Sequence, residues 1–206
     1  MQYTENLTLK LPEEGDTSLV RTDMNYNWAI LDAIVISSMM HRMMIQDIKA
    51  ASLTGIHAAI TGNGATQDIA TEISNPDEAR NPTITTTNNA APSGDVVISG
   101  LVRGVADTET LTIIPGSTVK GNKPFDTVTN IRIPAGVSGA DTVSVGFGDK
   151  VGLVYEISAI TKVYKVEINS VDVTSTYADK VNATYSTIDF STISAYQDIK
   201  IFYRED

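Results

Sequence analysis

The feature that most constrains the fold is a succession of short runs of alternating apolar and polar residues after residue 54. Turn-forming clusters separate these runs, among them Gly62-Asn63-Gly64 and Pro134-Ala135-Gly136. The runs occupy residues 55–61, 67–73, 82–87, 95–103, 108–114, 128–133 and 142–147. Alternation with period two indicates half-buried strands, and strands at this spacing are typical of a β-sandwich. We therefore predict a mainly β fold, with an Ig-like or jelly-roll-like sandwich over residues 54–157.

The β pattern continues to the C-terminus. Residues 161–168 alternate, and in the terminal run the side chains of Ile199, Ile201 and Tyr203 share one face. These runs predict a C-terminal β subdomain over residues 158–206, with its last strand paired in a sheet. Whether residues 54–206 form one domain or two stays open at this stage.

The preceding segment has a different composition. Thr22 and Asp23 are good helix N-cap residues, and neither Gly nor Pro occurs from Met24 to Ala51. The sequence therefore predicts a long α-helix over residues 22–51. Apolar residues at spacings of three and four form a heptad seam along it, as in a coiled coil. With its flanking residues, the seam predicts an oligomer interface of Trp28, Leu31, Ile34, Val35, Ser38, His41, Ile45 and Ile48.

The predicted helix is apolar on more than one face, so it must be buried. We predict that other subunits cover it, which makes the helix an oligomerising segment. The alternative is that it packs on its own β domain as an ordinary core element. His41 would be either a polar layer that fixes the register of the subunits or an ordinary hydrogen-bonded histidine.

Residues 1–21 are interpreted as an extended arm that ends in a turn near Pro12 and Gly15. Leu7, Leu9 and Leu11 alternate along this arm. An arm of this length cannot bury its own apolar side chains, so we predict that these leucines contact a neighbouring subunit. A flexible terminus is the alternative.

Charge and composition exclude several classes of partner and chemistry. The chain has no cysteine, which excludes thiol catalysis, cysteine-based zinc sites and disulfides. Its net charge of -10 repels a nucleic-acid backbone. Residues 1–10 lack the features of a secretory signal, and no apolar run approaches the roughly 20 residues that cross a bilayer. We therefore predict neither nucleic acid nor membrane as a partner.

No residue pattern indicates catalysis. The two histidines, His41 and His57, lie outside any nucleophile-elbow motif. The glycine-rich stretches 116–123 and 146–150 lack P-loop spacing and are interpreted as turns between strands. Scattered carboxylates at Asp77, Glu78, Asp107, Glu109 and Asp141 form no EF-hand ladder, although a calcium site in a loop stays open. We predict a protein that is not an enzyme and has no cofactor, catalytic residue or metal site.

Tyrosines concentrate in the C-terminal third of the chain. They are Tyr155, Tyr164, Tyr177, Tyr185, Tyr196 and Tyr203. Because tyrosine is enriched at recognition surfaces, a face that binds a receptor or glycan is one interpretation. Ordinary strand packing is the other.

Two stretches near the N-terminus resemble the attachment segment of tailed-phage head and tail appendage proteins. They are YTENLTLKLP at residues 3–12 and DMNYNWAILD at residues 23–32. Residues 66–82, 121–125 and 149–153 resemble a β domain of phage structural proteins such as head fibres and decoration proteins. Together these stretches cover most of the chain. The chain lacks shaft repeats, so a long fibre is not expected.

This resemblance implies a homotrimer located in the virion, with Leu7, Leu9 and Leu11 as virion-anchor residues and the major capsid protein or another virion protein as partner. The expected function is that of a capsid decoration or short head-fibre protein. One alternative is a tail or baseplate appendage that binds a host receptor or surface glycan. A second is an enzyme such as a polysaccharide depolymerase.

Overall fold

The computed structural model describes residues 2–3, 10–11 and 40–205. The chain divides into two compact units, Met1–His41 and Arg42–Asp206. In the first unit, strands β1 (Gln2–Tyr3) and β2 (Lys10–Leu11) pair in antiparallel fashion. We call the second unit the body. It is mainly β, as predicted.

The body contains three sheets. The first has the order β5 (Gln67–Ile69), β10 (Thr127–Ile133), β7 (Asp95–Val102), β8 (Val105–Thr112). The second joins β9 (Thr118–Lys120), β6 (Arg80–Thr86), β11 (Thr142–Gly152), β15 (Thr187–Asp189) and β14 (Val181–Asn182), with β4 (Ser52–Thr61) also paired to β11. The third has the order β13 (Val171–Asp172), β12 (Val163–Ile168), β16 (Gln197–Arg204), β3 (Met40–Ile48). Short helical turns are η1 (Ile160–Lys162), α2 (Thr174–Tyr177) and η2 (Ala178–Lys180).

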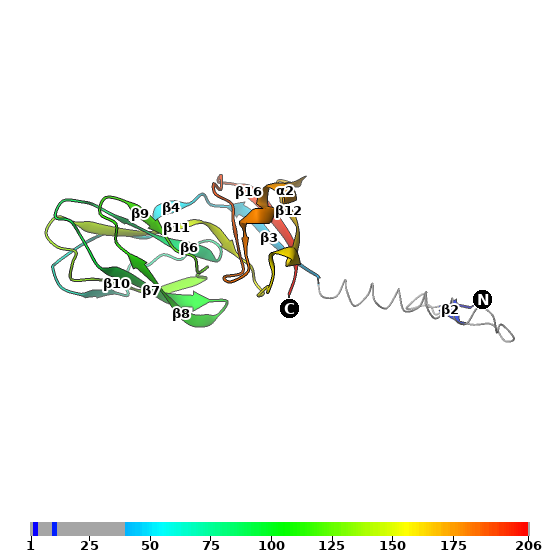
Figure 1. The fold of residues 1–206 in the computed structure, drawn as a ribbon, viewed down its shortest axis with the longest axis horizontal. Coiled ribbons are helices and arrows are strands. Elements are labelled where there is room, and N and C mark those ends of the chain that lie inside the picture. Colours follow the sequence, from blue (N-terminus) through cyan, green and yellow to red (C-terminus); the bar gives the residue numbers. More distant parts are fainter. Residues whose placement is uncertain (1, 4–9, 12–39, 206) are drawn as a thin grey trace. The chain divides into compact units, whose positions relative to one another are not determined.

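The first two sheets enclose one hydrophobic core. Ile98 and Ile131 come from the first sheet, whereas Ile84 and Val145 come from the second, and all four are buried in the same cluster. Figure 1 shows the two layers, with β7, β8 and β10 facing β4, β6 and β11. The predicted β-sandwich is therefore confirmed. Its finer description as Ig-like or jelly-roll-like stays a prediction.

A second core lies beside the third sheet. It is formed by residues from β3, β12 and β16, together with residues from β11 onward. Its buried members include Ile48, Val166, Ile188, Ile201 and Tyr203. The second core therefore draws on residues 43–48 as well as on the C-terminal part of the chain.

Strand β11 contributes to both cores. Val143, Val145 and Phe147 lie in the first core, whereas Val151 lies in the second. Along the same strand β4 pairs with the first half and β15 with the end. Residues 146–150 fall within this strand, so their interpretation as a turn was wrong. Gly146 is required there, because an added Cβ would lie 1.9 Å from the carbonyl oxygen of Ser52.

The α-helix predicted over residues 22–51 is wrong from Met40 to Ile48, which forms strand β3. Residues 22–39 lie outside the described part of the chain. In β3 the side chains of Met43 and Ile45 are buried, whereas Met44 is exposed, as expected for period two. Asp47 then has a positive φ of 51°, which shifts the alternation and turns Ile48 inward as well. Ile45 and Ile48 are therefore three residues apart and buried on the same side, a spacing that in sequence looks like one face of a helix.

A buried arginine fastens three segments of the body together. Arg80, the first residue of β6, is fully buried. Its Nε donates a hydrogen bond of 2.7 Å to the carbonyl oxygen of Gly148 in β11, to which Nη2 also donates. Its Nη1 donates to the carbonyl oxygen of Lys49, just after β3, at 3.1 Å. The guanidinium also lies 5.1 Å from the centre of the Phe147 ring and 3.5 Å from Asp77. Burial lowers the pKa of Arg80, and Asp77 opposes that shift.

Candidate functional site

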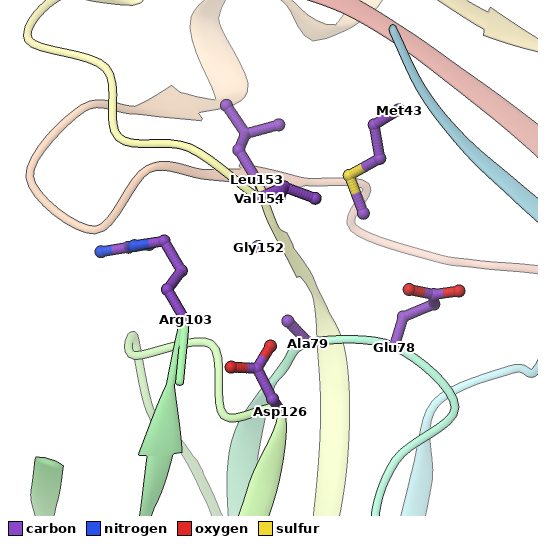
Figure 2. A pocket seen from close by; sticks show the side chains of 8 residues that line it. All are labelled: Met43, Glu78, Ala79, Arg103, Asp126, Gly152, Leu153 and Val154. Atoms are coloured by element: carbon purple, nitrogen blue, oxygen red, sulfur yellow. The ribbon is translucent and has the colours of Figure 1, made fainter. Parts of the chain in front are cut away.

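The candidate site is a pocket of about 290 Å³ in the body, shown in Figure 2. Its lining residues are Met43, Glu78, Ala79, Arg103, Asp126, Gly152, Leu153 and Val154. Met43 and Leu153 belong to the second core, whereas Arg103 follows β7 and Asp126 precedes β10. The pocket thus lies where the ends of the sandwich strands meet the second core.

Backbone turns fix two of the charged groups. Arg103 lies in the β7–β8 turn with a φ of 50°, and the backbone N–H of the next residue, Gly104, donates to Oδ2 of Asp126 at 3.2 Å. The Arg103 guanidinium donates to Glu156 at 2.9 Å and to the carbonyl oxygen of Tyr185 at 3.2 Å. In Figure 2 it points away from Glu78. The Arg103 guanidinium is therefore held by Glu156 and Tyr185, and the cation that acts on Glu78 is Arg80.

Glu78 is the electrostatically perturbed member of the pocket. Burial raises the pKa of its carboxyl group, and the negative charges of Asp77 and Asp126 raise it further, against the opposing effect of Arg80. Acidic groups beside the apolar walls of Met43 and Leu153 could receive a small cationic or hydroxyl-bearing group. Among the described residues, no group of three or more His, Asp or Glu is placed to hold a metal ion.

We expect Glu78→Gln to stabilise the body at neutral pH. A raised pKa in the folded state gives stability that is present at low pH and lost as the pH rises through that pKa. Glutamine removes the cost of the charge, with a gain of at most about 1 kcal/mol because solvent screens a half-exposed group. Melting temperatures should differ at pH 7 and converge below the ordinary glutamate value of 4.5. The exposed Glu72→Gln is the control. An equal gain at both pH values would contradict the electrostatic explanation.

The residues of the predicted oligomer interface are only partly covered by the structure. Ile45 and Ile48 are buried in the second core of their own chain, and His41 is half-buried. The other members, Trp28, Leu31, Ile34, Val35 and Ser38, lie outside the described residues. The interface stays a prediction.

The predicted anchor residues and the tyrosines have different outcomes. Leu11 lies in β2, whereas Leu7 and Leu9 lie outside the described residues. Tyr196 is 82% exposed, and Tyr155 and Tyr164 are also exposed. Tyr203 is buried, and its hydroxyl accepts a hydrogen bond from the backbone N–H of Tyr155 at 3.2 Å. At least three tyrosines are therefore available to a partner.

The sequence did not indicate the pocket as a set. Glu78 was noted among scattered carboxylates, but Arg103 and Asp126 carried no signal. The three residues are far apart in the chain, and only the pairing of β6, β7 and β10 with their neighbours brings them together. Arg80 was missed as well, since nothing in its sequence context marks it as buried.

No protein-family model matches the chain, and comparisons with curated proteins and with solved structures found no match. Within the described part of the chain, no helix is both long and apolar enough to span a bilayer. Function is therefore inferred from the residues and their geometry.

Proposed function

We propose that this chain is a non-enzymatic structural protein of a tailed-phage virion, a capsid decoration or short head-fibre protein anchored by its N-terminal unit. One observation carries the proposal. Both stretches that resemble phage attachment segments, residues 3–12 and 23–32, lie within the unit Met1–His41. The body that follows is a separate compact unit of strands. This division between the resembling segments and the β body supports the proposal of an anchored virion protein.

The proposed mechanism is binding. Apolar residues of the N-terminal unit, including Leu7, Leu9 and Leu11, would be buried against the major capsid protein or another virion protein. Such burial contributes roughly 25 cal/mol per Å² before the costs of association. Three copies in a homotrimer would bind the particle simultaneously. Once one copy is bound, the effective concentration of the other two is high, which raises the overall affinity.

The alternative is a tail or baseplate appendage that recognises a host receptor or surface glycan. The exposure of Tyr155, Tyr164 and Tyr196 favours it, because tyrosine combines an apolar ring with a polar hydroxyl and is enriched in recognition surfaces. This function would use the same anchor and differ in what the body binds.

We expect the full chain to sediment with phage particles that were assembled without it, and a shortened chain beginning at Met40 to stay in the supernatant. The shortened chain keeps all of β3, so the body retains its second core. Light scattering should give a trimer for the full chain and a monomer for the shortened one.

Two results would contradict the proposal. Equal sedimentation of both chains would place attachment in the body, and a full chain that never sediments would remove it from the virion. Saturable binding of the shortened chain to host cells, with the full chain located at the tail, would select the appendage alternative.

A further inference from the structure

The side-chain nitrogen of Lys150 contacts the side-chain amide of Asn122. Lys150 Nζ donates hydrogen bonds to Asn122 Oδ1 at 2.5 Å and to the carbonyl oxygen of Gly121 at 3.0 Å. A C=O bond is about 1.23 Å long, so the amide carbon Cγ lies within about 3.7 Å of Nζ. Reacting atoms in a near-attack arrangement are roughly 3–3.5 Å apart. The amine nitrogen therefore lies near the separation from which it can attack the amide carbon.

A buried asparagine maintains this approach. Asn81 Oδ1 accepts a hydrogen bond of 2.9 Å from the backbone N–H of Lys150, and its Nδ2 donates one of 3.0 Å to the carbonyl oxygen of Gly121. Asn81 has no exposed surface. It therefore joins strand β11 to the loop between β9 and β10, and so holds Lys150 and Asn122 together although they are far apart in the chain.

A carboxyl group contacts the backbone of the loop that contains Asn122. Glu109 of β8 accepts hydrogen bonds from the backbone N–H groups of Asn122 at 2.6 Å and Lys123 at 3.2 Å. Burial raises the pKa of its carboxyl group, whereas these N–H donors and the charges of Lys123 and Lys150 lower it. The neighbouring Lys123 is bound elsewhere, to Asp107 at 2.7 Å. Glu109 is thus a half-buried carboxyl group within the electrostatic reach of Lys150.

We propose that Lys150 and Asn122 condense into an intramolecular isopeptide bond. The lone pair of the neutral Nζ attacks Cγ of Asn122, and the new Nζ–Cγ bond replaces the Cγ–Nδ2 bond. The leaving nitrogen departs as ammonia after it receives a proton that Nζ gives up. Glu109 accepts the proton from Nζ and passes it to the leaving nitrogen. Glu109 therefore ends the reaction in the protonation state in which it began. The step needs no oxidant, metal or energy source.

The bond would link β11 covalently to the loop between β9 and β10. The isopeptide bond can form whether or not the chain belongs to a virion, because all of its groups lie within the body. A covalent link between these two segments would resist mechanical unfolding of the sheet to which β11 belongs.

Mass spectrometry of the intact full chain tests the proposal. The mass is expected to be lower than the sequence mass by one molecule of ammonia. Lys150→Arg and Asn122→Ala should each have the full mass calculated from its own sequence, with no loss of ammonia. Glu109→Gln keeps an oxygen that can accept the backbone hydrogen bonds but cannot take up a proton, so it should also retain the full mass.

Tryptic digestion locates the bond. The peptide of residues 121–132 should remain joined to residues 133–162, with no cleavage after Lys150. A full sequence mass in the wild-type chain after long incubation at neutral and mildly alkaline pH would overturn the proposal. So would a loss of ammonia that persists in Lys150→Arg, because it would arise from another asparagine or glutamine. Full condensation in Glu109→Gln would overturn the role of Glu109.

Discussion

Replacing Arg80 by methionine is expected to lower the free energy of unfolding by about 3–5 kcal/mol, the usual cost of removing one member of a buried charged network. Methionine fills much of the same volume but donates no hydrogen bond. The buried carbonyl oxygen of Gly148 would lose its donor, at about 1–3 kcal/mol, and the part-buried carbonyl oxygen of Lys49 would lose one at a smaller cost. Asp77 would lose its ion pair with Arg80 and keep only the hydrogen bond from the backbone N–H of Lys49.

Urea unfolding followed by fluorescence measures this loss. The matched control is Arg132→Met, because Arg132 is 56% exposed and pairs with Asp68 on the surface. Its loss should cost less than about 1 kcal/mol. If both variants lost the same small amount of unfolding free energy, the Arg80 hydrogen bonds would not stabilise the contacts between the segments around it. Domains are stable by only about 5–15 kcal/mol, so the predicted loss is a large part of the total.

A chain that begins at Ser52 is expected to lose the structure of the second core. The shortening removes β3 and with it the buried side chains of Met43, Ile45 and Ile48. Removing one large apolar side chain from a core costs about 2–5 kcal/mol, so the loss of all three exceeds what a small core can supply. It also removes Lys49, which accepts a hydrogen bond from Arg80.

Hydrogen exchange distinguishes local from global loss. In the chain from Ser52, the backbone amides of β12 and β16 should exchange rapidly, whereas a chain from Met40 should protect them. Protection of β7 and β10 should persist longer, because the sandwich core does not include β3. Equal protection of β12 and β16 in the two chains would show that β3 is dispensable.

The sandwich was predictable because its signals are local. Each strand alternates within a few residues, and turn residues mark where it ends. Strand β3 was not predictable in the same way. The positive φ of Asp47 places two exposed residues between the buried Ile45 and Ile48, and this spacing imitates one face of a helix. The absence of Gly and Pro reinforced the wrong interpretation.

The sites were beyond sequence analysis for a different reason. Glu109, Asn122 and Lys150 meet because β8, the loop after β9 and β11 converge, and no spacing along the chain encodes that order. Residues 121–125 and 149–153 were singled out for their resemblance to a phage β domain, but nothing showed that they would contact each other. Burial decides the role of Arg80, and burial depends on the complete fold.

The strand that runs through both cores limits how this protein can change by recombination. Modules joined by a linker can be exchanged, because each keeps its own hydrophobic residues when the linker is cut. Here Val145 and Val151 lie six positions apart in β11 and serve different cores. A recombination crossover within or beside β11 would combine residues from two different parents in the same strand. The side chains of one core would then no longer match those they pack against. We therefore expect the body to be inherited as one unit, with sequence diversity concentrated in its loops.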